Sequence, residues 1–264
     1  QTALRSELPA GSELVLAHFS NCLDETPYCV IVDHAWQSVV ITIRGSHSFE
    51  DFMVDAMAEP RSLEEAGKKW GFDGTGMHAH DGILRRTEWI RRDLEESGVL
   101  RLLLGDTSAR GDWDPDLPTG TGSERRAGAR VGAAAAGGGR GGGTGMAIGG
   151  GERSGFGSPR RTGSGRTFSS LAPLAAALGG SGFCMGYTIR TVGHSLGAGC
   201  AALLSLLLKA DYPSVRALAV SPPGGLVSEG ACREATEAMV TSIVLNDDVV
   251  PRMSAQSIEA LADQ

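Results

Sequence analysis

A serine with glycines two residues before and two residues after it is the residue of this sequence best suited to chemistry. Gly193, Ser195 and Gly197 form the pattern G-x-S-x-G in the segment GHSLG. A serine hydroxyl becomes a nucleophile for acyl transfer when a sharp strand-to-helix turn holds it clear of the surrounding backbone, and side chains at the two glycine positions would collide in that turn. We therefore predict Ser195 as a nucleophile. The alternative is a turn without chemistry in a chain that holds 38 glycines. We call residues Gly193–Gly197 the nucleophile elbow.

The residues around Ser195 have the properties that such a turn requires. The β-branched run Tyr187–Val192 predicts a strand before it, and Leu196–Lys209 (LGAGCAALLSLLLK) predicts a strongly apolar helix after it. The backbone N–H of Leu196 lies at the start of that helix, where it could donate to an oxyanion. His194 is adjacent to Ser195 in sequence, so we expect its imidazole to point away from the hydroxyl.

Two further positions could complete a hydrolase site. Thr241–Leu245 predicts a strand, and Asp247 and Asp248 follow it directly, as the acid of a catalytic triad follows a late strand. Either carboxylate is eligible, and a solvated turn is the alternative. Ser46 follows the predicted strand Ser38–Ile43 and could supply a second oxyanion N–H; the alternative is an ordinary loop serine.

The base of such a triad should be a histidine that follows the acid in the chain. The six histidines all precede Asp248; they are His18, His34, His47, His78, His80 and His194. The pattern therefore leaves the base unassigned, and we expect the domain to be incomplete at its C-terminal end.

Strands that alternate with helices predict an α/β domain over residues 1–264, with a mostly parallel sheet and helices on both faces. The remaining predicted elements are the strands Tyr28–Asp33 and Val215–Val220 and the helices Ser48–Ala58, Gly82–Ser97 and Glu229–Met239. Residues 105–166 hold 20 of the 38 glycines and lack apolar periodicity. This composition predicts a disordered, low-complexity insertion.

Composition excludes several classes of function. The formal net charge is −7, which gives no support for a nucleic-acid partner. The five cysteines include no CxxC pair, so neither a disulfide framework nor a zinc site is predicted. We find no signal peptide and no apolar run long enough to span a membrane.

Six segments of the chain resemble the catalytic domain of class 3 (fungal-type) lipases. They are PYCVIVDH (27–34), VVITIRGS (39–46), HDGIL (80–84), VGHSLGAG (192–199), YPSVRALAVSPPGGLVSE (212–229) and VLNDDVVPR (244–252). The run SPPGGL and its spacing to DVVPR favour the sn-1-specific diacylglycerol lipases within this class. The resemblance covers residues 25–104 and 185–260.

The resemblance implies an α/β-hydrolase fold and the hydrolysis of an acyl ester of a glycerolipid, most simply diacylglycerol to monoacylglycerol and fatty acid. It implies association with the cytoplasmic side of a membrane. It implies Ser195 as nucleophile, Asp248 rather than Asp247 as the acid because Asp248 precedes V-V-P-R, and Ser46 at the oxyanion position. His80 falls in a structural H-D-G element. The family is associated with calcium, although the sequence shows no calcium loop, and no other cofactor is expected.

Two more segments acquire an interpretation from the resemblance. Ser48–Ala58 falls where fungal lipases carry a short lid, and residues 105–166 fall at a variable regulatory insertion of diacylglycerol lipases. The transmembrane segments that usually precede this domain are not in the sequence. Because no histidine follows the predicted acid, the alternative function is an inactive lipase-like module that binds lipid or a protein partner. An esterase or protease on the same fold is disfavoured by SPPGGL.

Overall fold

The computed structural model describes residues 7–19, 25–45, 59–105, 182–232 and 238–254, the backbone of 166–168, and residues 257 and 260. The chain divides into two compact units, of which Trp113–Gly163 lies outside the described residues. The predictions for Ser46, for the helix Ser48–Ala58 and for nearly all of the insertion also lie outside them, as does the middle of the predicted helix Glu229–Met239. The described residues belong to the other unit, Gln1–Asp112 with Ser164–Gln264.

A sheet of seven strands, counted over the described residues, organises this unit in the order β6-β1-β2-β3-β7-β8-β9. The strands are β1 (Ser12–His18), β2 (Tyr28–Asp33), β3 (Ser38–Ile43), β6 (Arg166–Phe168), β7 (Thr188–His194), β8 (Arg216–Val220) and β9 (Val240–Ile243). The pairs from β6 to β3 are antiparallel, and the pairs from β3 through β7 and β8 to β9 are parallel. The parallel half is the α/β arrangement that the alternation of strands and helices predicts, and the nucleophile elbow lies in it.

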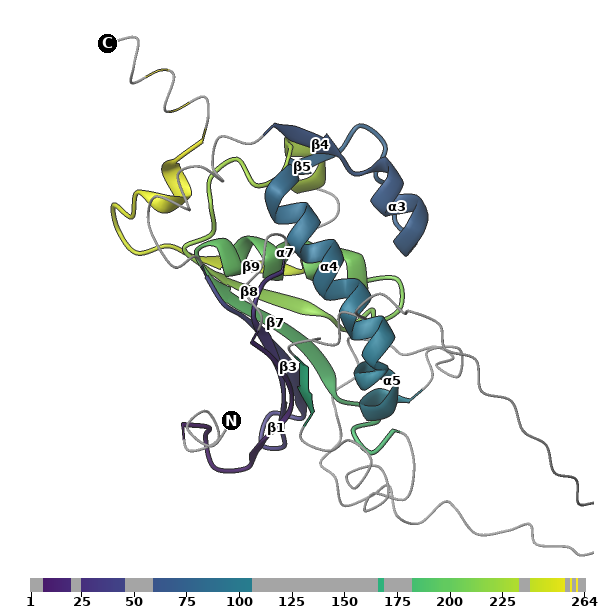
Figure 1. The fold of residues 1–264 in the computed structure, drawn as a ribbon. Coiled ribbons are helices and arrows are strands. Elements are labelled where there is room, and N and C mark those ends of the chain that lie inside the picture. Colours follow the sequence, from purple (N-terminus) through teal and green to yellow (C-terminus); the bar gives the residue numbers. More distant parts are fainter. Residues whose placement is uncertain are drawn as a thin grey trace, which may run out of the picture. The chain divides into compact units, whose positions relative to one another are not determined.

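The helices of the described residues are short apart from two. They are α3 (Glu64–Trp70), α4 (Asp81–Ser97), α5 (Val99–Leu104), α7 (Leu196–Leu208) and the 3-10 turn η3 (Val250–Arg252). A second, two-stranded sheet pairs β4 (Pro60–Ser62) with β5 (His78–His80). Helix α7 packs on β7, β8 and β3, and α4 packs on α7, so these helices form successive layers over one face of the sheet (Figure 1).

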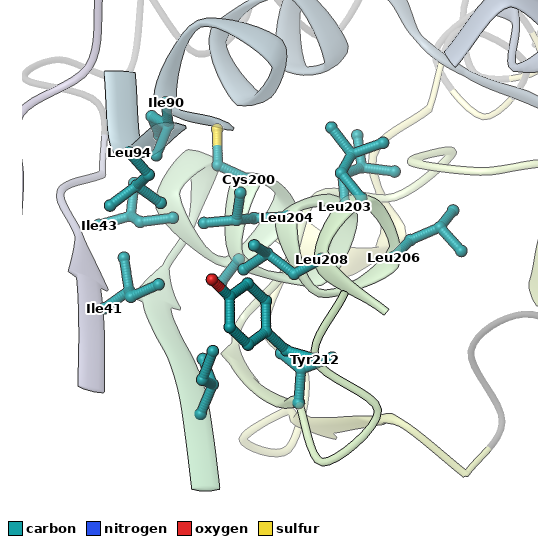
Figure 2. Packing of buried hydrophobic residues seen from close by; sticks show 14 of the residues in the cluster. Ile41, Ile43, Ile90, Leu94, Cys200, Leu203, Leu204, Leu206, Leu208 and Tyr212 are labelled. Atoms are coloured by element: carbon teal, nitrogen blue, oxygen red, sulfur yellow. The ribbon is translucent and has the colours of Figure 1, made fainter. Parts of the chain in front are cut away.

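Helix α7 is the centre of the hydrophobic core because every residue in it is buried. The helix is covered by the sheet, by α4 and by α3, which is why it is apolar all round rather than along one stripe. Figure 2 shows Leu204 and Leu208 of α7 among Ile43 of β3 and Ile90 and Leu94 of α4. The helix that follows the nucleophile elbow is therefore held firmly from both sides.

Truncation of this core should destabilise the fold strongly. Leu204 is 0% exposed, so Leu204→Ala removes buried methyl groups from the hydrophobic core. We expect a loss of about 2–5 kcal/mol in the free energy of unfolding, measured by urea denaturation. Leu245→Ala is the matched control, because Leu245 is 75% exposed and should cost less than about 0.5 kcal/mol. Equal losses in both variants would contradict the buried position of Leu204.

Candidate active site

The nucleophile elbow has the strained backbone that the sequence pattern predicts. Ser195 connects β7 to α7 with φ 55° and ψ −126°, a conformation that non-glycine residues rarely adopt. The N–H of Ser195 donates to the carbonyl of Val220 on β8 at 3.0 Å, and its carbonyl accepts from the N–H of Ala198 at 2.9 Å. These bonds to the neighbouring strand and to the first turn of α7 maintain the strain. Residues held in this way cluster at functional sites.

Both glycines of the elbow are required by close backbone contacts. A Cβ atom on Gly193 would lie 2.1 Å from the carbonyl oxygen of Gly197. A Cβ atom on Gly197 would lie 2.4 Å from the carbonyl oxygen of Ile43 and 2.8 Å from that of Arg44. The second contact shows that the start of α7 is pressed against the end of β3. The spacing G-x-S-x-G is therefore a steric requirement of this turn.

An added methyl group at this contact should disrupt the elbow. Gly197→Ala forces the backbone of α7 away from β3, and overpacking of this kind costs about 1–3 kcal/mol or more. We expect a lower melting temperature in calorimetry. Gly230→Ala is the matched control, because a Cβ atom there would meet nothing within 4 Å. A wild-type melting temperature for Gly197→Ala would be inconsistent with the contact.

The loop after β3 approaches the nucleophile directly. A Cβ atom on Gly45 would lie 2.7 Å from the carbonyl oxygen of His194 and 3.7 Å from the Cβ of Ser195. Ser46, the predicted second oxyanion donor, is the next residue and lies outside the described residues. Leu196 is the first residue of α7, and the first N–H groups of an α-helix have no partner within the helix. The Ser195 side chain makes no capping bond to them.

The loop after β9 holds Asp248 in a network of hydrogen bonds. Its N–H donates to the carbonyl of Leu245 at 3.0 Å, and its Oδ1 accepts from the N–H of Val250 at 3.0 Å. A side-chain hydrogen bond with Ser221, at the end of β8, is the largest cause that lowers the pKa of Asp248. The N–H of Val250 lowers that pKa further, so the carboxylate form is favoured.

Two further side chains interact electrostatically with the carboxylate of Asp248. Electrostatic interactions with His194 and Arg252 lower the pKa of Asp248 in the same direction as the hydrogen bonds. Asp247 is fully exposed, and its Oδ1 lies 4.0 Å from Nη2 of Arg252. The sequence leaves both aspartates eligible as the acid. Only Asp248 has its carboxylate held by hydrogen bonds, in the loop that follows β9.

The described histidines occupy other places. His194 ends β7 and is exposed. His80 caps α4, where its Nδ1 accepts from the N–H of Ile83 at 3.4 Å, in agreement with a structural role for the H-D-G element. Within the described part of the chain, no hydrogen bond joins a histidine to Ser195. His47 is outside that part.

The interaction of Ser221 with Asp248, the predicted acid, is a feature that our sequence reasoning missed. Ser221 opens the run SPPGG, which we used for the resemblance without giving the serine a role. For metal binding, the described residues contain no group of three His, Cys, Asp or Glu side chains able to hold an ion. The helices of those same residues include none with the length and apolarity to cross a bilayer.

Known proteins resemble this chain in sequence. Residues 174–258 match the family model for lipase (class 3). Diacylglycerol lipase-alpha of Rattus norvegicus is 29% identical over 249 residues, which are 93% of this chain and 16% of that protein. Diacylglycerol lipase-beta of Mus musculus is 28% identical over 243 residues, or 92% of this chain and 24% of that protein. The chain thus spans a quarter or less of the length of these relatives.

Known structures resemble it as well. The lipase of Rhizopus microsporus var. chinensis superimposes with a TM-score of 0.51 at 13% identity, over 94% of this chain and 58% of that one. This likeness establishes the fold, so the predicted α/β-hydrolase fold is confirmed. The sequence matches confirm the resemblance to class 3 lipases, and to diacylglycerol lipases among them.

Proposed function

We propose that this chain carries the catalytic domain of a serine lipase, a carboxylic ester hydrolase that cleaves an acyl ester of a glycerolipid. The most favoured reaction is diacylglycerol to monoacylglycerol and fatty acid. The observation that carries this proposal is the strained conformation of Ser195 between β7 and α7, which needs both glycines of the elbow. The matches to diacylglycerol lipases support the substrate class.

Each site residue has a role in the proposed mechanism. The hydroxyl of Ser195 attacks the ester carbonyl, and the glyceride alcohol leaves with the proton taken from that hydroxyl, so that an acyl-enzyme remains. Water then hydrolyses the acyl-enzyme to free fatty acid and restores the serine. The N–H of Leu196 and the predicted donor Ser46 stabilise the oxyanion. Asp248 orients the imidazole that removes the proton from Ser195. In hydrolases of this fold that histidine follows the acid in chain order.

Exposed apolar side chains around Asp248 support a lipid substrate at a membrane surface. Ile243, Val244, Leu245 and Val249 are 48%, 43%, 75% and 53% exposed, and all lie within five residues of this carboxylate. Large apolar side chains that gather at the surface indicate contact with an apolar partner. We propose that these exposed apolar side chains contact the lipid surface from which the substrate comes.

A lipase-like module without catalysis is the alternative. It is favoured by the absence of a hydrogen bond between Ser195 and any described histidine. Such a module would bind lipid or a protein partner through the same apolar surface without using Ser195 as a nucleophile.

A covalent probe separates these two functions. The natural, full-length protein should react with a fluorophosphonate at Ser195, located by mass spectrometry, and should release fatty acid from diacylglycerol in mixed micelles. Protein that binds diacylglycerol vesicles without labelling or turnover would support the binding module instead. Denatured protein serves as the control for non-specific labelling.

A further inference from the structure

Three cationic side chains gather toward the amino ends of β7 and β8, whereas the nucleophile elbow lies at their carboxyl ends. Arg190 of β7 and Arg216 of β8 are direct neighbours in the register of the two strands. Each donates from Nη1 to a carbonyl in the turn of residues 213–215, Arg190 at 3.3 Å and Arg216 at 2.8 Å. Lys209, which follows α7, donates from Nζ to the carbonyl of Pro213 at 2.9 Å, and Arg216 reaches the same carbonyl at 3.4 Å. We call these three side chains the cation cluster.

No carboxylate balances the cation cluster within the part of the chain that the structure describes. None of its three members forms an ion pair there. Asp211, the acid closest to Lys209 in sequence, pairs with Arg91 instead. Burial and then the charge of Arg216 lower the pKa of Arg190, and the same two causes lower the pKa of Lys209. Like charges on directly opposite residues destabilise a sheet, so a bound anion would offset a cost that the fold otherwise carries.

The two arginines lie on the face of the sheet that α7 does not cover. Thr191, the next residue along β7, faces α7, because its Oγ1 donates to the carbonyl of Ala201 at 2.8 Å. Side chains alternate between the two faces of a strand, so the arginines face the other way. Val192 and Leu218 share their face, are paired in register and are only half-buried. Helices α4 and α7 lie over the opposite face (Figure 1). An anion can therefore reach both guanidinium groups from solvent.

We propose that the cation cluster binds the phosphate group of a soluble phosphate monoester. In the described part of the chain each arginine donates hydrogen bonds through Nη1 alone, so Nε and Nη2 are left for a ligand. The planar fork of a guanidinium matches the spacing of phosphate oxygens. A phosphate monoester carries close to two negative charges at neutral pH, which suits three cations better than a single carboxylate does. This site lies apart from the active site and is independent of the proposed function.

The place of the cation cluster in the fold favours a soluble ligand over a lipid headgroup. Strand β8 runs from Arg216 to Val220, so about 13 Å of strand separate the cluster from the carboxyl ends of the sheet. The exposed apolar side chains that we expect to contact lipid, among them Leu245 and Val249, follow β9 at those carboxyl ends. A bilayer against these side chains would leave the cluster in water.

Phosphate-dependent stability of the natural, full-length protein tests the site. The melting temperature is measured by calorimetry in increasing concentrations of inorganic phosphate and then of glycerol 3-phosphate. Sodium chloride at equal ionic strength is the reference, because salt alone screens repulsion within the cluster. A ligand that binds only the folded state raises the melting temperature, so we expect both phosphates to raise it more than chloride does. Equal effects of phosphate and chloride would overturn the proposal.

The variant Arg216→Gln separates an anion site from a merely structural contact. We expect its apparent affinity for phosphate to fall about tenfold or more, because charge-assisted hydrogen bonds are lost. In chloride its melting temperature should stay near that of wild type, because repulsion of Arg190 is relieved. If Arg216 only supported the turn of residues 213–215, the variant would melt lower in both salts and keep the full phosphate effect, which would refute the site.

Two further variants make this comparison specific. Arg190→Gln removes the other arginine of the pair and should lose phosphate affinity as well, which keeps the test valid if Arg216→Gln folds poorly. Arg92→Gln is the matched control, because it removes the same charge from an exposed position on α4. It should leave phosphate affinity unchanged. An equal loss of affinity in Arg92→Gln would reduce the effect to net charge and contradict a defined site.

Vesicles distinguish a headgroup from a soluble phosphate. Phosphatidylcholine vesicles with and without phosphatidic acid, whose headgroup is a phosphate monoester, are sedimented with wild-type protein and with Arg216→Gln. We expect the two proteins to bind phosphatidic acid vesicles equally, because the cation cluster lies away from the lipid surface. Binding that depends on phosphatidic acid and is lost in Arg216→Gln, without any response to soluble phosphate, would overturn the proposal and assign the cluster to a headgroup.

Discussion

Replacement of Ser195 by alanine should reduce ester hydrolysis by about 10⁴-fold or more while the fold stays intact. The reaction loses its nucleophile, and only oxyanion stabilisation and substrate binding remain. Alanine has the same Cβ atom as serine, so φ 55° is neither relieved nor worsened. The Ser195 side chain makes no capping bond to α7, so its loss removes no support from the helix. Steady-state hydrolysis of diacylglycerol by the natural, full-length protein measures the effect.

Thermal unfolding separates this chemical loss from damage to the fold. We expect the melting temperature of Ser195→Ala to lie within a few degrees of wild type, and fluorophosphonate labelling to disappear. Ser242→Ala removes an exposed hydroxyl from β9 and should keep both activity and labelling. Retention of more than a few per cent of activity in Ser195→Ala would show that another residue is the nucleophile.

Replacement of Asp248 by asparagine should lower kcat by about 10³–10⁴-fold with little change in KM. Asparagine keeps the shape of the side chain and one acceptor for the N–H of Val250, but it cannot carry the negative charge that stabilises an imidazolium. Asp247→Asn is a matched control one residue away. Asp247 is fully exposed and has only a 4.0 Å contact with Arg252, so we expect less than a threefold effect there.

The ranking of the two aspartate variants is the decisive comparison. It is measured by steady-state kinetics on the same substrate, with melting curves for both proteins. A larger loss in Asp247→Asn than in Asp248→Asn would reverse our assignment of the acid. Equal and small losses would remove both aspartates from the mechanism.

Strands and helices that have strong local signals could be predicted from the sequence. Strands that form only through pairing with a distant segment were missed. The runs Tyr28–Asp33 and Ser38–Ile43 form strands with the predicted bounds, and α7 ends one residue earlier than predicted. Their β-branched or apolar residues are sufficient to indicate them. Strand β4 (Pro60–Ser62) has no such signal, because it exists through its pairing with β5. The apolar run in β1 was present in the sequence but remained without an interpretation.

The site was predictable to a similar extent. Ser195 and its glycines could be predicted because the nucleophile elbow is local. Its steric requirements concern only five consecutive residues. The pattern alone could not rank Asp247 and Asp248, and only the resemblance favoured Asp248. The contact with Ser221 was beyond sequence reasoning, because it joins residues 27 positions apart and depends on how β8 and β9 align. The role of Ser46 stays a prediction.

The pairing of β3 with β7 has a consequence for how the protein folds. Ser38 of β3 lies beside Thr188 of β7, 150 residues later in the chain. Closing so long a loop costs little extra at equilibrium, about 0.6 kcal/mol for each doubling of its length, but such non-local pairing slows folding. A ribosome that adds about 5–20 residues per second needs roughly 8–30 s between the two strands. Throughout this interval the edge of β3 exposes unpaired N–H and carbonyl groups. A strand of another chain could form hydrogen bonds with them. The nascent chain is therefore most open to aggregation, and most in need of a chaperone, before the segment with the nucleophile has been made.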